Sequence, residues 1–283
     1  MKILFLLLLI IFVPDFAFAW GFETHVNIGI RILENVNFSL IKDYPVHFLL
    51  GNIFPDFFNL FKDISTFKKN LQTHKWGTVS KLFKNAKTQS EKSFAYGYAA
   101  HLSADIVAHN YFVPHSMLLV SKNKLFSHFL IEYAEESYNE KKIYYTLRYL
   151  LDHAVEFGSL FLDTFNIEEK YFARQIKILK TGISYQKIFR LSDFAKKIKK
   201  TRVKEFKERC DYFGEQSYLM AKHSVEKGFF DFIKFDPSGK KKMSLAKLNR
   251  EKLMKDIGKK VLKDFDKENT FLNTHKPSFE PSK

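Results

Sequence analysis

Apolar residues recur at helical spacing through most of the chain after residue 20. Residues 25–36, HVNIGIRILENV, place Val26, Ile30 and Leu33 on one face, which predicts an amphipathic helix capped by Thr24. The same spacing predicts helices at 93–112, 125–139 and 141–165, from about 193 to 235, and from about 244 to 265. No alternating pattern long enough for a strand appears, so we predict an all-α fold, a single multi-helix bundle.

Three stretches break this pattern. Residues 44–61 are apolar but contain Gly51 and Pro55, which predicts that part of the stretch is a loop. FDPSGKKK, residues 235–242, predicts a turn followed by a run of charge, and the last eleven residues, NTHKPSFEPSK, predict a disordered tail. We therefore divide the chain into residues 1–19, a main domain at 20–235, and a Lys-rich helix with a tail at 236–283.

The first nineteen residues follow the pattern of a secretory signal peptide. Lys2 precedes an apolar run from Ile3 to Val13, and Ala17 and Ala19 form a small-residue cleavage site. A membrane anchor is the alternative, but the run is shorter than the roughly 20 residues that span a bilayer. We expect cleavage after Ala19, export to the periplasm or the medium, and a mature chain that begins at Trp20.

Cysteine content and net charge limit how the chain can be stabilised and which surfaces it can contact. Cys210 is the only cysteine, so no internal disulfide can stabilise an exported chain, and stability must come from packing or from metal. The formal net charge is +15, which favours contact with anionic surfaces such as phospholipid headgroups or nucleic acid. A solvated face of a Lys-rich chain would give the same charge, and the sequence leaves both explanations open.

The segment HLSADIVAH carries the strongest sign of chemistry. His101, Asp105 and His109 follow one another at intervals of four, so at about 100° per residue they form one narrow stripe of a helix. Apolar residues flank the stripe, and a polar stripe inside a bundle is costly unless it holds a cation. The alternative is a stripe that faces solvent. We favour metal binding, because imidazole suits zinc and a carboxylate can bridge two ions.

Four weaker units surround this segment. His128 and Glu132 also lie four residues apart, although such pairs occur by chance on surface helices. Asp56 follows a proline in an apolar setting, where it serves either a metal or, as the alternative, an N-cap or an Asx turn. His74 lies in THKWG and His25 in ETH. Together these units supply more donors than one mononuclear site needs.

In this order, the motifs resemble those of a known family. The motifs AFA-WG…TH, GN-x-x-PD, THKW, GYAAHLSADIVAHN and HxxxE, within residues 20–132, are similar to those of the zinc-dependent phospholipases C. They also resemble the catalytic domain of glycosylphosphatidylinositol-specific phospholipase D and, more distantly, the S1/P1 nucleases. The resemblance implies a helical bundle of the phospholipase C/P1 nuclease type with up to three zinc ions in a cleft between helices.

The resemblance also implies which residues hold the zinc. The first ion would be bound by the free α-amino group and carbonyl oxygen of Trp20, together with His25 and Asp105. The ligands of the second ion would be Asp56, His74, His101 and Asp105. The ligands of the third ion would be His109, His128 and Glu132.

One departure from the family leaves an alternative at the third ion. The secreted phospholipases have five residues between the aspartate and the next histidine, whereas only three separate Asp105 from His109. The shorter spacing matches the phospholipase D branch, and His115 remains the alternative to His109. His47 and His153 match no motif, and we interpret them as packing or surface residues.

The predicted function is hydrolysis of phosphodiesters in phospholipid headgroups. A pair of zinc ions would activate water, the third would neutralise the leaving group, and Asp56 would orient or deprotonate the water. The chain has no evident C-terminal lipid-binding β-sandwich, so contact with a membrane surface would come from the helical domain or the Lys-rich C-terminal third. We expect a monomer.

Two other functions remain alternatives. One is a nuclease of the S1/P1 type on the same metals, which the positive charge would suit. The HxxxE pair, where a nuclease of this type has HxxxD, makes nucleic acid the less favoured substrate. The other is a non-catalytic, zinc-stabilised envelope protein.

Overall fold

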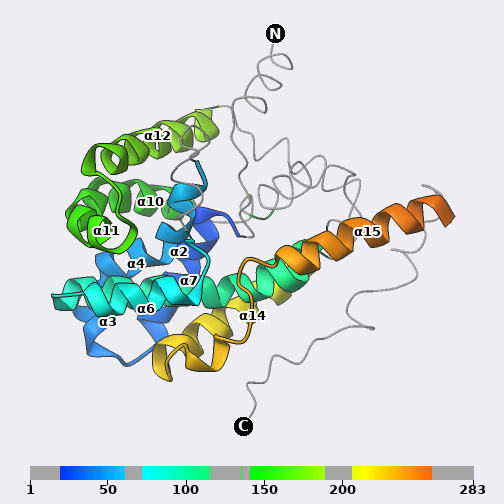
Figure 1. Cartoon of the computed structure of the whole chain (residues 1–283), viewed down its shortest axis with the longest axis horizontal. Coiled ribbons are helices and arrows are strands. Elements are labelled where there is room, and N and C mark those ends of the chain that lie inside the picture. Colours follow the sequence, from blue (N-terminus) through cyan, green and yellow to red (C-terminus); the bar gives the residue numbers. More distant parts are fainter. Residues whose placement is uncertain are drawn as a thin grey trace.

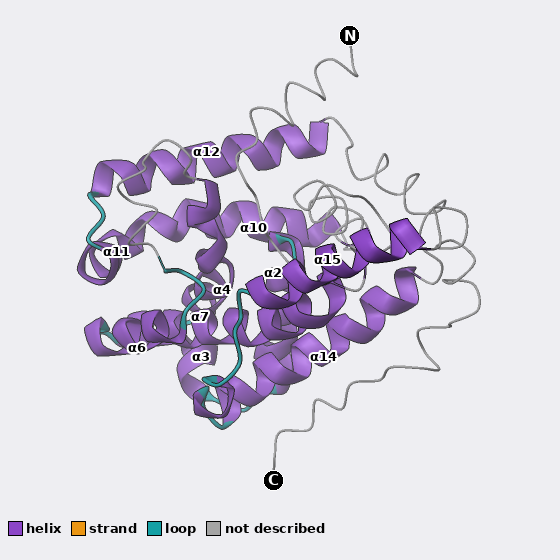
Figure 2. Cartoon of the chain, turned by 45° about the vertical axis from the view of Figure 1, so that its right-hand side comes forward, coloured by secondary structure: helices purple, strands orange, loops and turns teal. Residues whose placement is uncertain are grey.

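The computed structural model describes residues 20–60, 72–114, 116, 135, 141–188 and 206–256. Every regular element in these ranges is a helix, which confirms the predicted all-α fold (Figure 2). None of the described helices is long and apolar enough to cross a bilayer. The predicted signal peptide, the predicted tail and all of the predicted helix at 125–139 except Glu135 lie outside the described residues.

The helices follow one another through the whole described chain. In order they are α2 (Phe22–Asn35), α3 (Ser39–Asp43), α4 (Pro45–Ile53), η1 (Phe54–Leu60), α6 (Trp76–Asn85), α7 (Gln89–Val107), η2 (Ala108–Phe112), α10 (Lys141–His153), η3 (Ala154–Phe157), α11 (Gly158–Phe165), α12 (Glu169–Ile188), α14 (Phe206–Glu226), η4 (Phe230–Phe232) and α15 (Lys240–Asp256).

Helix α7 is the centre of the bundle. Its most extensive contacts are with α4 and α14, while α10, α11 and α12 form a group beyond α4 (Figure 1). The helix begins at a capping box, in which the Thr88 hydroxyl accepts from Glu91 N and the Glu91 carboxylate accepts from Thr88 N. From Phe94 to Val107 almost every side chain is buried, so polar residues on α7 lie inside the protein.

Two glycines allow α4 and α7 to touch backbone to backbone. A Cβ atom added to Gly51 would lie 2.0 Å from the Phe94 carbonyl oxygen, and one added to Gly97 would lie 1.9 Å from the Phe48 carbonyl oxygen. Gly51 therefore does not break the helix, contrary to the prediction, but permits this crossing. The predicted loop is also wrong at Pro55, because residues 54–60 continue as the 3₁₀ helix η1.

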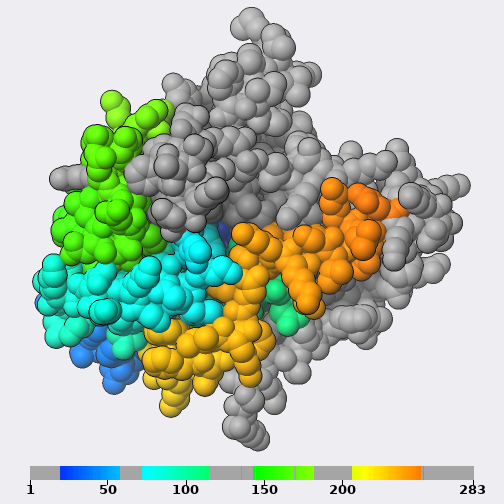
Figure 3. Space-filling view, viewed as in Figure 1, coloured from blue at the N-terminus to red at the C-terminus, as the bar shows by residue number. Residues whose placement is uncertain are grey.

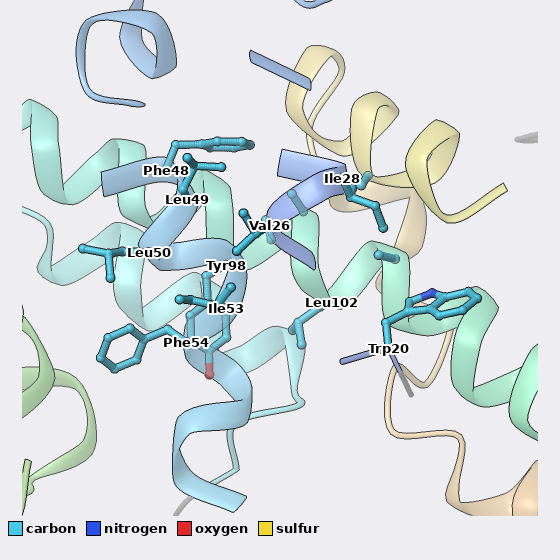
Figure 4. Close-up of a cluster of buried hydrophobic side chains, with 14 of the residues drawn as sticks. Trp20, Val26, Ile28, Phe48, Leu49, Leu50, Ile53, Phe54, Tyr98 and Leu102 are labelled. Carbon is cyan, nitrogen blue, oxygen red and sulfur yellow. The ribbon is translucent and has the colours of Figure 1, made fainter. Parts of the chain in front are cut away.

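The core joins the early helices through aromatic and aliphatic side chains. Figure 4 shows residues of α2, α4 and α7 gathered together, with Trp20 at one side. Trp20 is fully buried, its ring stacks on Phe112 at 4.5 Å between centroids, and its indole nitrogen donates to Ser217 Oγ at 2.8 Å. Helix α14 thus holds the residue at which the mature chain is predicted to begin.

Thr24 is not the cap of the first helix, as the sequence predicted. Helix α2 begins at Phe22, and the Gly21 carbonyl oxygen accepts from the backbone of Thr24 and His25. Thr24 therefore lies within the first turn, where its hydroxyl donates to the carboxylate of Glu135, at 2.7 Å from Oε1 and 2.6 Å from Oε2.

The later helices differ in detail from their predicted ranges. Residues 141–165 divide into α10, η3 and α11, with the last helix starting at Gly158. The predicted turn at FDPSG is confirmed, and α15 starts directly after it at Lys240, four residues earlier than predicted. Of the stretch from about 193 to 235 that was predicted helical, residues 206–226 form α14, and residues 193–205 lie outside the described residues. The prediction is wrong for residues 227–235, which form turns around the short η4.

Candidate metal centre

The predicted stripe on α7 faces the interior of the bundle. His101, Asp105 and His109 are 0%, 1% and 3% exposed, so the alternative of a solvent-facing stripe is wrong. A π-helical turn, η2, begins at Ala108 and carries His109. Such wider turns occur often at functional sites, because they redirect a side chain without ending the helix.

Three further predicted residues converge on this stripe. His74 Nε2 lies 3.1 Å from Asp56 Oδ1 and 3.1 Å from Asp105 Oδ2. His101 Nε2 lies 3.1 Å from Asp105 Oδ2 and 3.7 Å from Asp56 Oδ2. His25 Nε2 lies 3.4 Å from Asp105 Oδ1, and its ring stacks on that of His101 at 3.8 Å between centroids. Asp105 is therefore common to three histidines that come from three different parts of the chain.

The spacing of these donor atoms suits metal ions. Two sets of three each have one donor atom per residue within 4.8 Å of the others. The sets are His25, Asp56 and His101, and His74, His101 and Asp105. The second set, with Asp56 beside it, contains the four residues that the resemblance assigned to the second ion.

Burial and charge move the pKa values of the two carboxyls apart. Burial raises the pKa of Asp56. Burial also opposes ionisation of Asp105, but the imidazoles of His101 and His109 outweigh it and hold its pKa well below the usual range. Asp105 is thus the permanent anion, and Asp56 is the better proton acceptor.

His74 carries the positive charge that balances these carboxylates. Burial acts to lower its pKa, but the carboxylates of Asp105 and Asp56, each 3.1 Å from its Nε2, outweigh burial and raise the pKa to about 10. Burial lowers the pKa values of His25, His101 and His109, so these rings are biased towards the neutral form that binds metal. A divalent cation bound among them would take over the role of the proton on His74.

Residues that sequence reasoning missed hold the rings in place. Asn52, fully buried, accepts from His101 Nδ1 at its backbone oxygen (2.8 Å) and donates from Nδ2 to the His25 carbonyl oxygen (2.8 Å). The Tyr98 hydroxyl donates to the Thr73 carbonyl oxygen at 2.9 Å, directly before His74. The sequence offered two signals for these residues. Asn52 is an amide within an apolar stretch, and Tyr98 lies one turn before His101.

The other histidines and the remaining carboxylate named in the sequence analysis lie either away from the centre or outside the described residues. His128, Glu132 and the alternative ligand His115 lie outside the described residues, so the third zinc site stays a prediction. His47 and His153 both approach Glu156, at 3.8 and 2.9 Å, away from the cluster.

Comparison with known families identifies the chain. A family model described as zinc dependent phospholipase C matches residues 24–203, more than half of the sequence. The chain belongs to this family. No curated protein and no solved structure matches it. The zinc-dependent phospholipase C match covers all of the described cluster and ends before α14.

The cluster fits the zinc that this family requires. Neither nitrogen of His25 and neither oxygen of Asp105 has a hydrogen bond to any described residue, although all four atoms are buried. Buried polar atoms normally have a partner, and imidazole with carboxylate is a donor set that zinc prefers. His101 and His74 also use Nδ1 for hydrogen bonds, to Asn52 O and Thr73 Oγ1, and direct Nε2 towards the carboxylates. This second hydrogen bond is typical of histidines that bind metal.

Proposed function

We propose that this chain is a phosphodiesterase that releases headgroups from phospholipids and is exported before it acts. The observation that carries the proposal is the cluster of four histidines and two carboxylates inside the region that matches the zinc-dependent phospholipases C, all of them buried except the partly buried His74. When bound, zinc would supply Lewis acidity that activates water and neutralises phosphate charge.

The two carboxylates of the cluster, Asp105 and Asp56, would have different roles in the reaction. Asp105 would stay ionised and hold His25, His74 and His101 in their places. Asp56, whose pKa is raised by burial, would accept a proton from water at its carboxylate and orient that water towards phosphorus. Carboxyls whose pKa values are moved apart in this way commonly have different roles in catalysis.

Headgroup release tests the proposal. The mature protein should hydrolyse a short-chain phosphatidylcholine when zinc-loaded, lose activity with a chelator, and recover it with added zinc. The products distinguish the bond cleaved, since phosphocholine marks the C type and choline the D type. Digestion of single-stranded DNA without headgroup release would favour the nuclease, and bound zinc without turnover on either substrate would favour the non-catalytic envelope protein.

The region after α14 supports contact with an anionic membrane surface. Its exposed apolar residues are Phe230, Ile233, Phe235, Leu245 and Leu248. The exposed lysines between and beside them are Lys234, Lys240, Lys241, Lys242 and Lys247. Exposed apolar side chains interspersed with lysine suit insertion between anionic headgroups, so we assign this surface to the lipid substrate.

A vesicle assay tests this surface. Replacing Phe230 and Ile233 with serine should weaken binding to vesicles containing phosphatidylserine by about tenfold or more, since each apolar side chain stabilises the bound state when it leaves water. Ile178 and Val155, also exposed but on α12 and η3, provide the matched serine control. Hydrolysis of dispersed short-chain lipid should stay unchanged in both variants. Equal vesicle binding by the two variants would refute the assignment.

A further inference from the structure

Three consecutive carbonyl groups near the C-terminal end receive hydrogen bonds from the metal centre and its neighbours. They belong to residues 235–239, here called the 235–239 loop. Trp76 Nε1 donates to the Phe235 oxygen at 3.0 Å, and Asn110 Nδ2 donates to the Asp236 oxygen at 2.8 Å. His109 Nδ1 bonds to the Pro237 oxygen at 2.5 Å. In Figure 3 the surface of the segment after α14, in orange, adjoins that of α6, in cyan.

The shape of the 235–239 loop is fixed by its own side chains. The Asp236 carboxylate accepts from Ser238 N at 3.0 Å and from Ser238 Oγ at 2.7 Å. Gly239 has φ of +53°, in the left-handed region that favours glycine. A Cβ atom added there would lie 2.3 Å from the His109 carbonyl oxygen and 2.5 Å from the His109 Cβ. Glycine therefore allows the loop to lie directly against His109.

The Pro237 carbonyl decides which nitrogen of His109 can bind metal. A carbonyl oxygen only accepts, so His109 Nδ1 must carry the proton, and in the neutral ring Nε2 then keeps the lone pair. His101 has the same arrangement, with its Nδ1 held by the Asn52 carbonyl oxygen at 2.8 Å. The two outer histidines of the α7 stripe are thus oriented by the same kind of bond, one from α4 and one from the 235–239 loop.

We propose that the 235–239 loop is a positioning element of the metal centre, which fixes the tautomer and direction of His109 so that Nε2 is its metal-binding atom. The loop lies beyond residues 24–203, so the family match does not assign it a role. The proposal rests on zinc binding in the proposed function, and does not depend on which substrate is cleaved.

A pair of glycine variants tests this positioning. Gly239→Ala should weaken zinc binding by about 10–100-fold, the usual effect of losing a partner that orients a ligand. Gly228→Ala is the matched control, because Gly228 also has positive φ (+92°) but its added Cβ would meet only Phe230 Cδ2, at 3.6 Å. The measurement is a competition titration with a chromophoric chelator, beside the melting temperature of the zinc-free protein. Equal loss of zinc affinity in both variants would refute the positioning role.

A second pair leaves the 235–239 loop sequence intact. Asn110→Ala removes two bonds, to the Asp236 oxygen and to the Ile106 oxygen, and should also weaken zinc binding. Asn85→Ala removes a similar pair of bonds, to Asp163 O and Thr164 Oγ1, at a distance from the centre, and should not. These variants decide the question if Gly239→Ala does not fold.

The unsubstituted protein gives a readout without metal. Nitrogen NMR of the zinc-free protein should show His109 protonated at Nδ1, and the opposite tautomer would overturn the proposal. Zinc binding without headgroup release would refute the proposed function and leave this inference standing. Headgroup release together with unchanged zinc affinity in both test variants would refute the inference alone.

Discussion

Replacing Asp105 with asparagine should abolish stable zinc binding and, with it, headgroup release. The Asp105 carboxylate lies within 3.4 Å of His25, His74 and His101, and it is the anion of the centre. Asparagine has the same shape but no charge, and its amide group would present hydrogens to nitrogens that need to bind metal. We expect zinc affinity to fall by at least about 100-fold, more than the loss of a hydrogen-bonding partner causes.

Metal content after gel filtration and a chelator competition titration measure this effect. Asp163→Asn is the control, since Asp163 is exposed and paired with Lys87 at 3.0 Å on the surface. That variant should bind zinc like the unsubstituted protein. If Asp105→Asn retains full zinc with unchanged affinity, the carboxylate is not a ligand and the centre must be built differently.

Replacing Gly51 with alanine should cause the largest loss of stability. The added Cβ would lie 2.0 Å from the Phe94 carbonyl oxygen, 2.8 Å from Phe94 C and 2.9 Å from Tyr98 N, all backbone atoms that no rotamer change can move. The helices α4 and α7 would have to separate. We expect a cost of about 3 kcal/mol, the upper end for an overpacked core. The separation would also move Asn52 away from His101, so zinc affinity should fall as well.

Urea unfolding of the zinc-free protein measures the change in free energy. Gly214→Ala is the matched control, because Gly214 also lies inside a helix, α14, and nothing lies within 4 Å of its added Cβ. In that position alanine should stabilise the protein by about 1 kcal/mol. A Gly51→Ala protein as stable as Gly214→Ala would mean that the two helices do not touch as described.

The parts of the fold and the centre that follow from local pattern were predictable from the sequence. The all-α class follows from periodicity, and the stripe of His101, Asp105 and His109 follows from one helix. The sequence also placed Asp56 in an apolar setting without a local partner, and the structure places its carboxylate beside His74 and His101.

Features that depend on packing between distant segments were not predictable in this way. A glycine between apolar residues predicts a break in a helix. Gly51 instead lies inside the uninterrupted helix α4, where its missing side chain lets α7 approach closely. Threonine is a residue type that often caps helices, but the Thr24 hydroxyl donates to Glu135, which is 111 residues away in the chain. Asn52 and Pro237 bind the histidine rings through backbone oxygens. Every residue has such an oxygen, so the residue type does not indicate this role.

The order of these contacts along the chain has a consequence for synthesis. Every described donor of the cluster lies between residues 25 and 109, but the oxygen that holds His109 belongs to a residue 128 positions further on. Chains fold as they are made, from the N-terminal side first. A growing chain therefore contains all the described histidines and carboxylates of the cluster before it contains the partner of the last one, and the bond between His109 and the Pro237 oxygen can form only after Pro237 has been added.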